Sequence, residues 1–89
     1  MATPEPTPRA AALRYQKGET APSLVASGRG HVADAILAAA EEAGIPIRED
    51  GPLVEALAHL ELGDRVPPEL YQAVAEALVW AYGLTRRRA

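Results

Sequence analysis

The chain has 89 residues, nearly half of them apolar, and a formal net charge of −3 at neutral pH. That length is enough for one compact domain and too short for two. The absence of cysteine excludes disulfides and thiolate chemistry, and no apolar run approaches the roughly 20 residues that a membrane-spanning helix needs. We therefore expect a small, soluble, cytoplasmic protein.

Charge is unevenly distributed along the chain. Residues 31–85 carry ten acidic side chains against Arg48 and Arg65, a balance of −8, whereas residues 86–88 are three consecutive arginines. Proteins that bind nucleic acids usually carry a basic stripe, which this acidic body disfavours. The arginine triplet is more typical of a solvated tail or a helix C-terminus, and nucleic-acid binding through it is a minor alternative.

The first part of the chain is predicted to be extended. Pro4, Pro6 and Pro8 alternate, which removes backbone donors, so we expect residues 1–8 to be a flexible leader. Strands are predicted over residues 9–15 and 23–27, on either side of a polar turn. The first strand contains three alanines, which are poor strand formers, so its pairing must come from tertiary contacts.

Three helices are predicted in the rest of the chain. Apolar residues recur every three to four positions over residues 30–43, and Gly44 suits a left-handed helix end. Residues 45–48 are interpreted as a short third strand. Asp50 is a good N-cap for a helix over residues 51–61, and the prolines at 67 and 68 predict the start of a helix over residues 67–83.

These elements predict an α/β (α+β) fold over residues 9–84, followed by a basic tail at residues 85–89. The sheet would have about three strands (about 9–15, 23–27 and 45–48), covered by the three helices. The succession of strand, helix and strand predicts a parallel, right-handed crossover.

Residues with catalytic or metal-binding chemistry are sparse. His31 and His59 each lack a second ligand at metal-site spacing, and the acidic pairs 41–42 and 49–50 are better explained as a solvated helix face and a helix cap. The segment Gly28-Arg29-Gly30 precedes a helix but is too short for a phosphate-binding loop. The sequence therefore predicts no enzyme activity, no metal site and no cofactor.

Trp80 has two interpretations. At 100° per residue it falls near Gln72 and Glu76, away from the apolar stripe that contains Val74 and Leu78. We favour packing along the second helix or the sheet edge; the alternative is a partly exposed aromatic anchor for a partner.

A set of short segments occurs in a characteristic order: ALRY at 12–15, AP at 21–22, VASG at 25–28, IPI at 45–47, PL at 52–53, LG at 62–63 and VPPELYQAVAEALVWAY at 66–82. From Glu5 onward, this order resembles the C-terminal cytoplasmic domain of FlhB, the flagellar type III export-switch protein, and its injectisome relatives. Full-length members carry an N-terminal transmembrane half. The resemblance therefore implies a short, stand-alone homologue of the cytoplasmic domain.

The family cuts its own backbone after the asparagine of an Asn-Pro-Thr-His loop, and the resemblance places that loop on a different set of residues here. Aligned on residues 13–15, it falls on Glu5, Pro6, Thr7 and Pro8. Glu5 has no amide nitrogen to attack its own carbonyl, and Pro8 has no imidazole to assist proton transfer. The resemblance thus implies a chain that does not cleave itself and is similar to the downstream cleavage product.

The resemblance also implies a docking patch for a short segment of early export substrates, at Ala21, Pro22, Ala75 and Leu78. Ordinary packing is the alternative explanation for all four residues. The Ala-Pro strand start is expected to leave unpaired edge groups to which a peptide could add.

The expected function is a non-catalytic binding module related to the flagellar or type III export apparatus. It would dock export substrates, or substitute for or regulate the cytoplasmic domain of the export-gate switch protein. Its expected partners are proteins of that apparatus and not nucleic acid, and a peripheral location at the inner membrane fits the same interpretation. The alternative is an orphan structural or regulatory domain that kept the fold without a secretion role.

Overall fold

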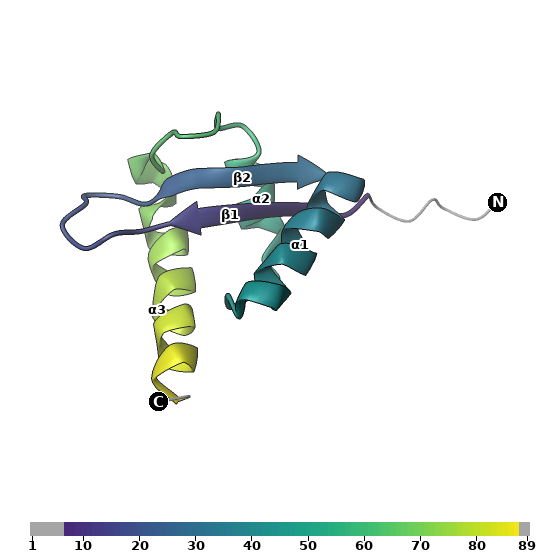
Figure 1. Cartoon of the computed structure of the whole chain (residues 1–89). Coiled ribbons are helices and arrows are strands. Elements are labelled where there is room, and N and C mark those ends of the chain that lie inside the picture. Colours follow the sequence, from purple (N-terminus) through teal and green to yellow (C-terminus); the bar gives the residue numbers. More distant parts are fainter. Residues whose placement is uncertain (1–6, 88–89) are drawn as a thin grey trace.

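An antiparallel pair of strands forms the centre of the fold, with helices against both of its faces (Figure 1). The computed structural model describes residues 7–87. Their elements, in chain order, are β1 (Arg9–Arg14), β2 (Ser23–Arg29), α1 (His31–Ala43), α2 (Gly51–Leu57), the 3-10 turn η1 (Pro68–Leu70) and α3 (Tyr71–Arg87). The predicted mixed α/β class with three α-helices is confirmed for these residues.

The two strands form a hairpin whose register determines which side chains are neighbours. Arg9 lies opposite Arg29, and at the other end Arg14 lies opposite Ser23, with a β-bulge after Ala12. A two-stranded ribbon is only marginally stable by itself. The alanine-rich β1 is therefore held as a strand by its partner and by the helices, as the sequence predicted.

Helices α1 and α2 pack on opposite faces of this ribbon (Figure 1). On the α1 face, Ala10 of β1 and Ala33 of α1 are buried. Gly28 of β2 allows α1 to come close, because a Cβ built at Gly28 would lie 2.1 Å from Cγ1 of Val32. The helix can approach only because residue 28 has no side chain.

The hydrophobic core lies on the other face of the ribbon. Leu24 of β2 is completely buried there, together with Leu53 and Leu57 of α2, Val66, and Val74 of α3. Residues from β1 and α3 pack around this cluster with part of their surface exposed. None of the polar or charged side chains in the described residues is buried, so apolar packing holds the elements together.

Two helix ends follow the sequence signals. Gly44 adopts the left-handed conformation that ends α1, and its N–H and that of Ile45 are hydrogen-bonded to carbonyls of the last turn. At the start of α2, the side chain of Asp50 accepts a hydrogen bond from the Leu53 N–H at 3.1 Å. Both capping predictions are confirmed.

The predicted third strand over residues 45–48 is wrong. The sheet of the described residues has only β1 and β2, so the predicted parallel crossover is wrong as well. The Ile45 N–H is hydrogen-bonded to the Ala40 carbonyl at the end of α1, and Pro46 has no N–H to offer a sheet. The side chains of Ile45 and Ile47 are 57% and 38% exposed, and the segment is a connection between two helices.

Other boundaries differ by smaller amounts. β1 ends one residue earlier and β2 two residues later than predicted. Helix α2 stops at Leu57 because residues 58–60 form a turn, which the Leu60 N–H closes on the Leu57 carbonyl. The third helix opens as the 3-10 turn and continues as α3 to Arg87. Within the described residues, no helix has both the length and the apolar character needed to cross a bilayer.

The close approach at Gly28 makes a sharp prediction. Gly28→Ala should lower the free energy of unfolding by about 1–3 kcal/mol, because the new methyl group would overlap the side chain of Val32 in α1. Urea unfolding followed by circular dichroism measures this loss.

The matched control is Gly83→Ala in α3, where a Cβ would meet nothing within 4 Å. This change should raise stability by up to about 1 kcal/mol, because alanine is the better helix former. An unchanged urea midpoint for Gly28→Ala would show that α1 does not pack on β2 in this way.

Candidate functional site

Two of the four residues expected in a docking patch lie inside the protein. Ala21 is 3% exposed, and Pro22 is also buried. The Pro22 carbonyl accepts a hydrogen bond from the Val66 N–H at 2.9 Å. Ala21 and Pro22 therefore contribute packing just before β2, and the Pro22 carbonyl is not available to a peptide.

The outer edge of this part of β2 is covered by the chain itself. The Leu24 N–H donates to the Asp64 carbonyl at 2.9 Å, and the Leu24 carbonyl accepts from the Gly63 N–H at 2.8 Å. Ser23 and Arg65 form an isolated antiparallel bridge, which lies between the Leu24–Asp64 and Val66–Pro22 hydrogen bonds. The expectation of unpaired edge groups at the Ala-Pro strand start is wrong, because residues 63–66 already use them.

The other two expected residues lie on α3, on different sides of it. Leu78 is half-buried and packs against the core, whereas Ala75 is exposed. Ala75 lines a shallow depression of about 450 Å³ along one face of α3, whose lining is Gln72, Ala75, Glu76, Val79 and Trp80. Ala21 and Pro22 do not line it, so the structure does not bring the four residues into one cavity.

This face of α3 is apolar and accessible. Val79 is 71% exposed, and Trp80 is only half-buried beside it. The C-terminal half of α3 extends away from the strands and the other helices (Figure 1). Trp80 lies beside Gln72 and Glu76 as the helical angle predicted, and part of its surface is exposed.

The segment aligned with the self-cleavage loop is only partly described. Glu5 and Pro6 lie outside the described residues, as does most of the predicted leader; Thr7 and Pro8 are exposed just before β1. The Pro8 carbonyl accepts a hydrogen bond from the Gly30 N–H at 2.8 Å. This bond attaches the start of β1 to the turn that leads into α1.

The remaining candidate polar residues of the described part of the chain lie at the surface or at a helix cap. His31 begins α1 and His59 follows α2, and both are exposed. Between residues 7 and 87, no group of three or more metal-ligating side chains could hold an ion. Asp50 acts as a helix cap.

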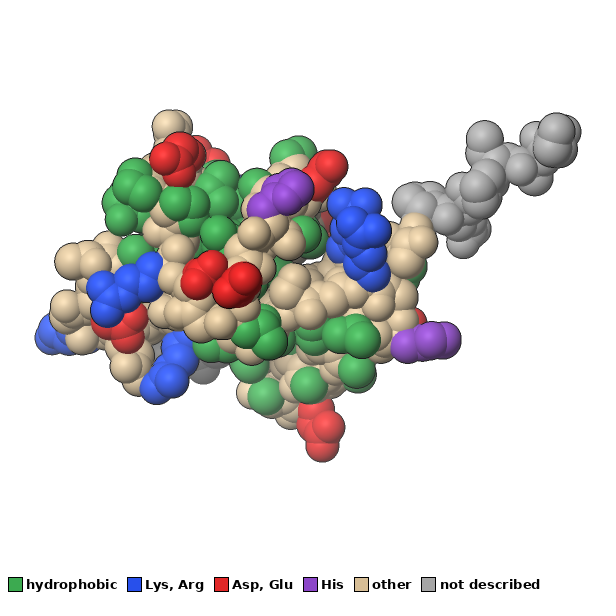
Figure 2. All heavy atoms as spheres, turned by 90° about the horizontal axis from the view of Figure 1, so that it is seen from above, with side chains coloured by type: hydrophobic (Ala, Val, Ile, Leu, Met, Phe, Trp, Pro, Cys, Tyr) green, Lys and Arg blue, Asp and Glu red, His purple; other side chains and the backbone are tan. Residues whose placement is uncertain are grey.

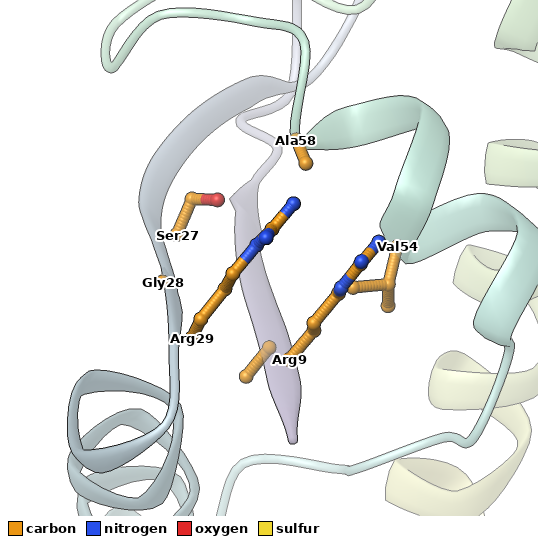
Figure 3. Close-up of a pocket in the computed structure, with 7 residues that line it drawn as sticks. Arg9, Ser27, Gly28, Arg29, Val54 and Ala58 are labelled. Carbon is orange, nitrogen blue, oxygen red and sulfur yellow. The ribbon is translucent and has the colours of Figure 1, made fainter. Parts of the chain in front are cut away.

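Sequence reasoning missed a second cavity, which lies between the sheet and α2 (Figure 3). Its lining includes Arg9 and Arg29, one from each strand. The signal available in the sequence was the hairpin register, since an antiparallel pairing of the two predicted strands brings their far ends together. The sequence prediction specified only the crossover between residues 23–27 and 45–48, and it assigned no pairing to the first two strands.

A family model described as the FlhB HrpN YscU SpaS family matches residues 4–81 of the chain. Among curated proteins, the uncharacterized protein YlqH of Bacillus subtilis is 45% identical over 80 residues, which is 89% of this chain and 86% of YlqH. The flagellar biosynthetic protein FlhB of Escherichia coli is 42% identical over 85 residues, which is 93% of this chain but only 22% of FlhB.

Solved structures agree with these sequence matches. A crystal structure of a point variant of the EscU C-terminal domain superposes with a TM-score of 0.80 and 32% identity, covering 85% of this chain and 94% of that domain. The crystal structure of the PscU C-terminal domain gives a TM-score of 0.78 and 34% identity, covering 84% and 98%.

The different burial of the patch residues predicts different effects of the same substitution. Pro22→Glu should destabilise the protein by several kcal/mol, because it places a carboxylate in a buried position. Ala75→Glu should change stability by less than about 0.5 kcal/mol, because Ala75 is exposed. Thermal unfolding of both variants tests this, and equal losses would contradict the assignment of Ala75 to the surface.

Proposed function

This chain belongs to the FlhB HrpN YscU SpaS family, and from that premise we propose that it is a cytoplasmic, non-catalytic binding module of a type III protein export apparatus. The observation that carries the proposal is the superposition on the EscU and PscU C-terminal domains over more than nine-tenths of their length. The chain spans only 22% of the FlhB of Escherichia coli. The matched region is one domain of FlhB, and the role proposed here is that of this domain.

The proposed activity is docking of a short apolar segment of an export substrate on α3. The depression beside Ala75 supports this role, because Val79 and Trp80 offer an apolar surface with an aromatic side chain, of the kind that anchors partner segments. Its polar borders, Gln72 and Glu76, can fix the orientation of a bound segment through hydrogen bonds.

Ala21, Pro22 and Leu78 have an indirect role in this proposal. The Pro22 carbonyl is bonded to Val66, and the Val66 side chain shares the core cluster with Val74 of α3. Leu78 lies one helical turn after Val74 and packs against the same cluster. The buried residues thus hold α3 in place, and the exposed residues of α3 meet the partner.

The docking proposal predicts a measurable loss of binding. Ala75→Glu should weaken binding of the docking peptide by about tenfold or more, because a carboxylate in an apolar contact loses its hydration. Trp80 is the only tryptophan of the chain and lines the same depression, so its fluorescence reports binding. The probes are peptides that tile the early export substrates of the source organism.

The matched control is Ala38→Glu, which makes the same change at an exposed position of α1 and should leave affinity unchanged. Equal affinities of the wild type and Ala75→Glu would refute docking on this face. If the chain binds neither these peptides nor the cytoplasmic parts of the export gate, the orphan structural or regulatory domain becomes the explanation.

We also propose that the chain does not cut its own backbone. The positions aligned with Asn-Pro-Thr-His carry Glu5, Pro6, Thr7 and Pro8, so the amide nucleophile and the imidazole are both missing. A carboxylate in place of the amide would have to close a strained cyclic anhydride. Without the cut, the domain acts through its surface alone.

The expected result is one intact species by mass spectrometry after days at room temperature and neutral pH. The positive control is a relative's C-terminal domain that carries Asn-Pro-Thr-His, treated in the same way. A fragment of this chain that begins at Pro6 would refute the proposal.

A further inference from the structure

The two arginines at the ends of the hairpin strands form a pair that nothing in the proposed docking role uses. Arg9 is the first residue of β1 and Arg29 the last residue of β2, and they lie directly opposite each other in the register. Figure 3 shows their side chains extending side by side in the same direction, toward Val54 of α2 and Ala58 just after it. Two positive charges therefore lie on one face of the sheet.

Repulsion between the two arginines destabilises the sheet, and no ion pair or hydrogen bond among the described residues offsets it. Like charges directly opposite each other on a sheet destabilise it. Both side chains are exposed, and within residues 7–87 neither guanidinium makes an ion pair or a hydrogen bond. Among the described residues, the donors of the pair are therefore directed to solvent without a partner.

The cavity around the pair has the size and the hydrogen-bond donors to hold a small polar group. The cavity has a volume of about 210 Å³ and is lined by Arg9, Ala10, Ser27, Gly28, Arg29, Val54 and Ala58. The Ser27 hydroxyl points toward the same space as the guanidinium groups (Figure 3). No carboxylate is among these lining residues, and Val54 and Ala58 form an apolar wall that strengthens charge pairing nearby.

We propose that this cavity binds a carboxylate side chain of an acidic segment in a protein partner. A guanidinium is a planar fork of donors that matches the two oxygens of a carboxylate, and Ser27 supplies a further donor. The cavity is smaller than the usual pockets for drug-sized ligands, which begin near 300 Å³. Its size suits one or two side chains.

The charge of the remaining surface favours a protein partner over a nucleic acid. Residues 31–85 carry ten acidic side chains against two arginines. Figure 2 shows acidic and basic side chains interspersed on the face seen from above. A nucleic acid needs a continuous row of phosphate contacts, whereas a single acidic side chain can reach an isolated pair of arginines. The site lies on β1, β2 and α2, so it is separate from the depression on α3.

The test is a titration of the full chain, labelled with ¹⁵N, with a blocked tri-glutamate peptide at low ionic strength. Backbone amide signals of residues 9–10, 27–29 and 54–58 should shift. The double variant R9Q/R29Q should bind about tenfold or more weakly, because it loses both charged forks. Added salt should weaken binding, as expected for a solvent-accessible charge contact.

Two controls separate a specific site from general charge. The variant R14Q/R48Q removes the same two positive charges at exposed positions elsewhere and should bind as the wild type does. A blocked tri-glutamine peptide should not shift the signals. Equal weakening in both double variants, shifts at other residues, or no binding of tri-glutamate would overturn the proposal.

A separate titration with inorganic phosphate distinguishes the two sources of an anionic group. Weaker binding of phosphate than of tri-glutamate is the expected result. Phosphate binding that is as tight as peptide binding, and that is lost in R9Q/R29Q, would assign the site to a phosphate group and would refute a carboxylate partner.

Discussion

The burial of Leu24 is the contact on which the rest of this small fold depends. Its side chain is fully enclosed by residues of α2, α3 and the segment before η1, and its backbone N–H and carbonyl are both bonded to residues 63–64. A two-stranded ribbon cannot hold helices on both faces by itself. Leu24 ties the ribbon to the second half of the chain, so the surfaces of α2 and α3 have fixed positions only when it is in place.

Two surfaces result from this arrangement, and they differ in chemistry. One is the apolar depression along α3 around Ala75, Val79 and Trp80. The other is the arginine pair beside α2, at the end of the ribbon where the strands meet α1. On the two proposals made above, a partner that carries both an apolar segment and an acidic segment would be recognised twice, because the surfaces lie on different elements. Linked contacts of this kind raise affinity without any stronger single contact.

The sequence predicted the features that depend on neighbours in the chain. Gly44 and Asp50 mark helix ends through local backbone geometry and capping, and both act as expected. Pairing between segments that are far apart in the chain was harder to predict from the sequence. The residues around Pro46 have the composition of a strand, yet whether they pair depends on a neighbour that the pattern does not specify. For the same reason the covered edge at Pro22 and the alignment of the two arginines were missed.

The coverage of β2 by residues 63–66 has a further consequence for behaviour at high concentration. Exposed strand edges are templates on which other chains can stack into aggregates, and proteins protect them with covering segments or with charge. Here the molecule's own backbone covers the edge of β2 at its first two residues, Ser23 and Leu24. β1 begins at Arg9 and ends at Arg14, so copies that stack in register along β1 would bring like charges together. Both features disfavour edge-to-edge stacking of copies of this domain.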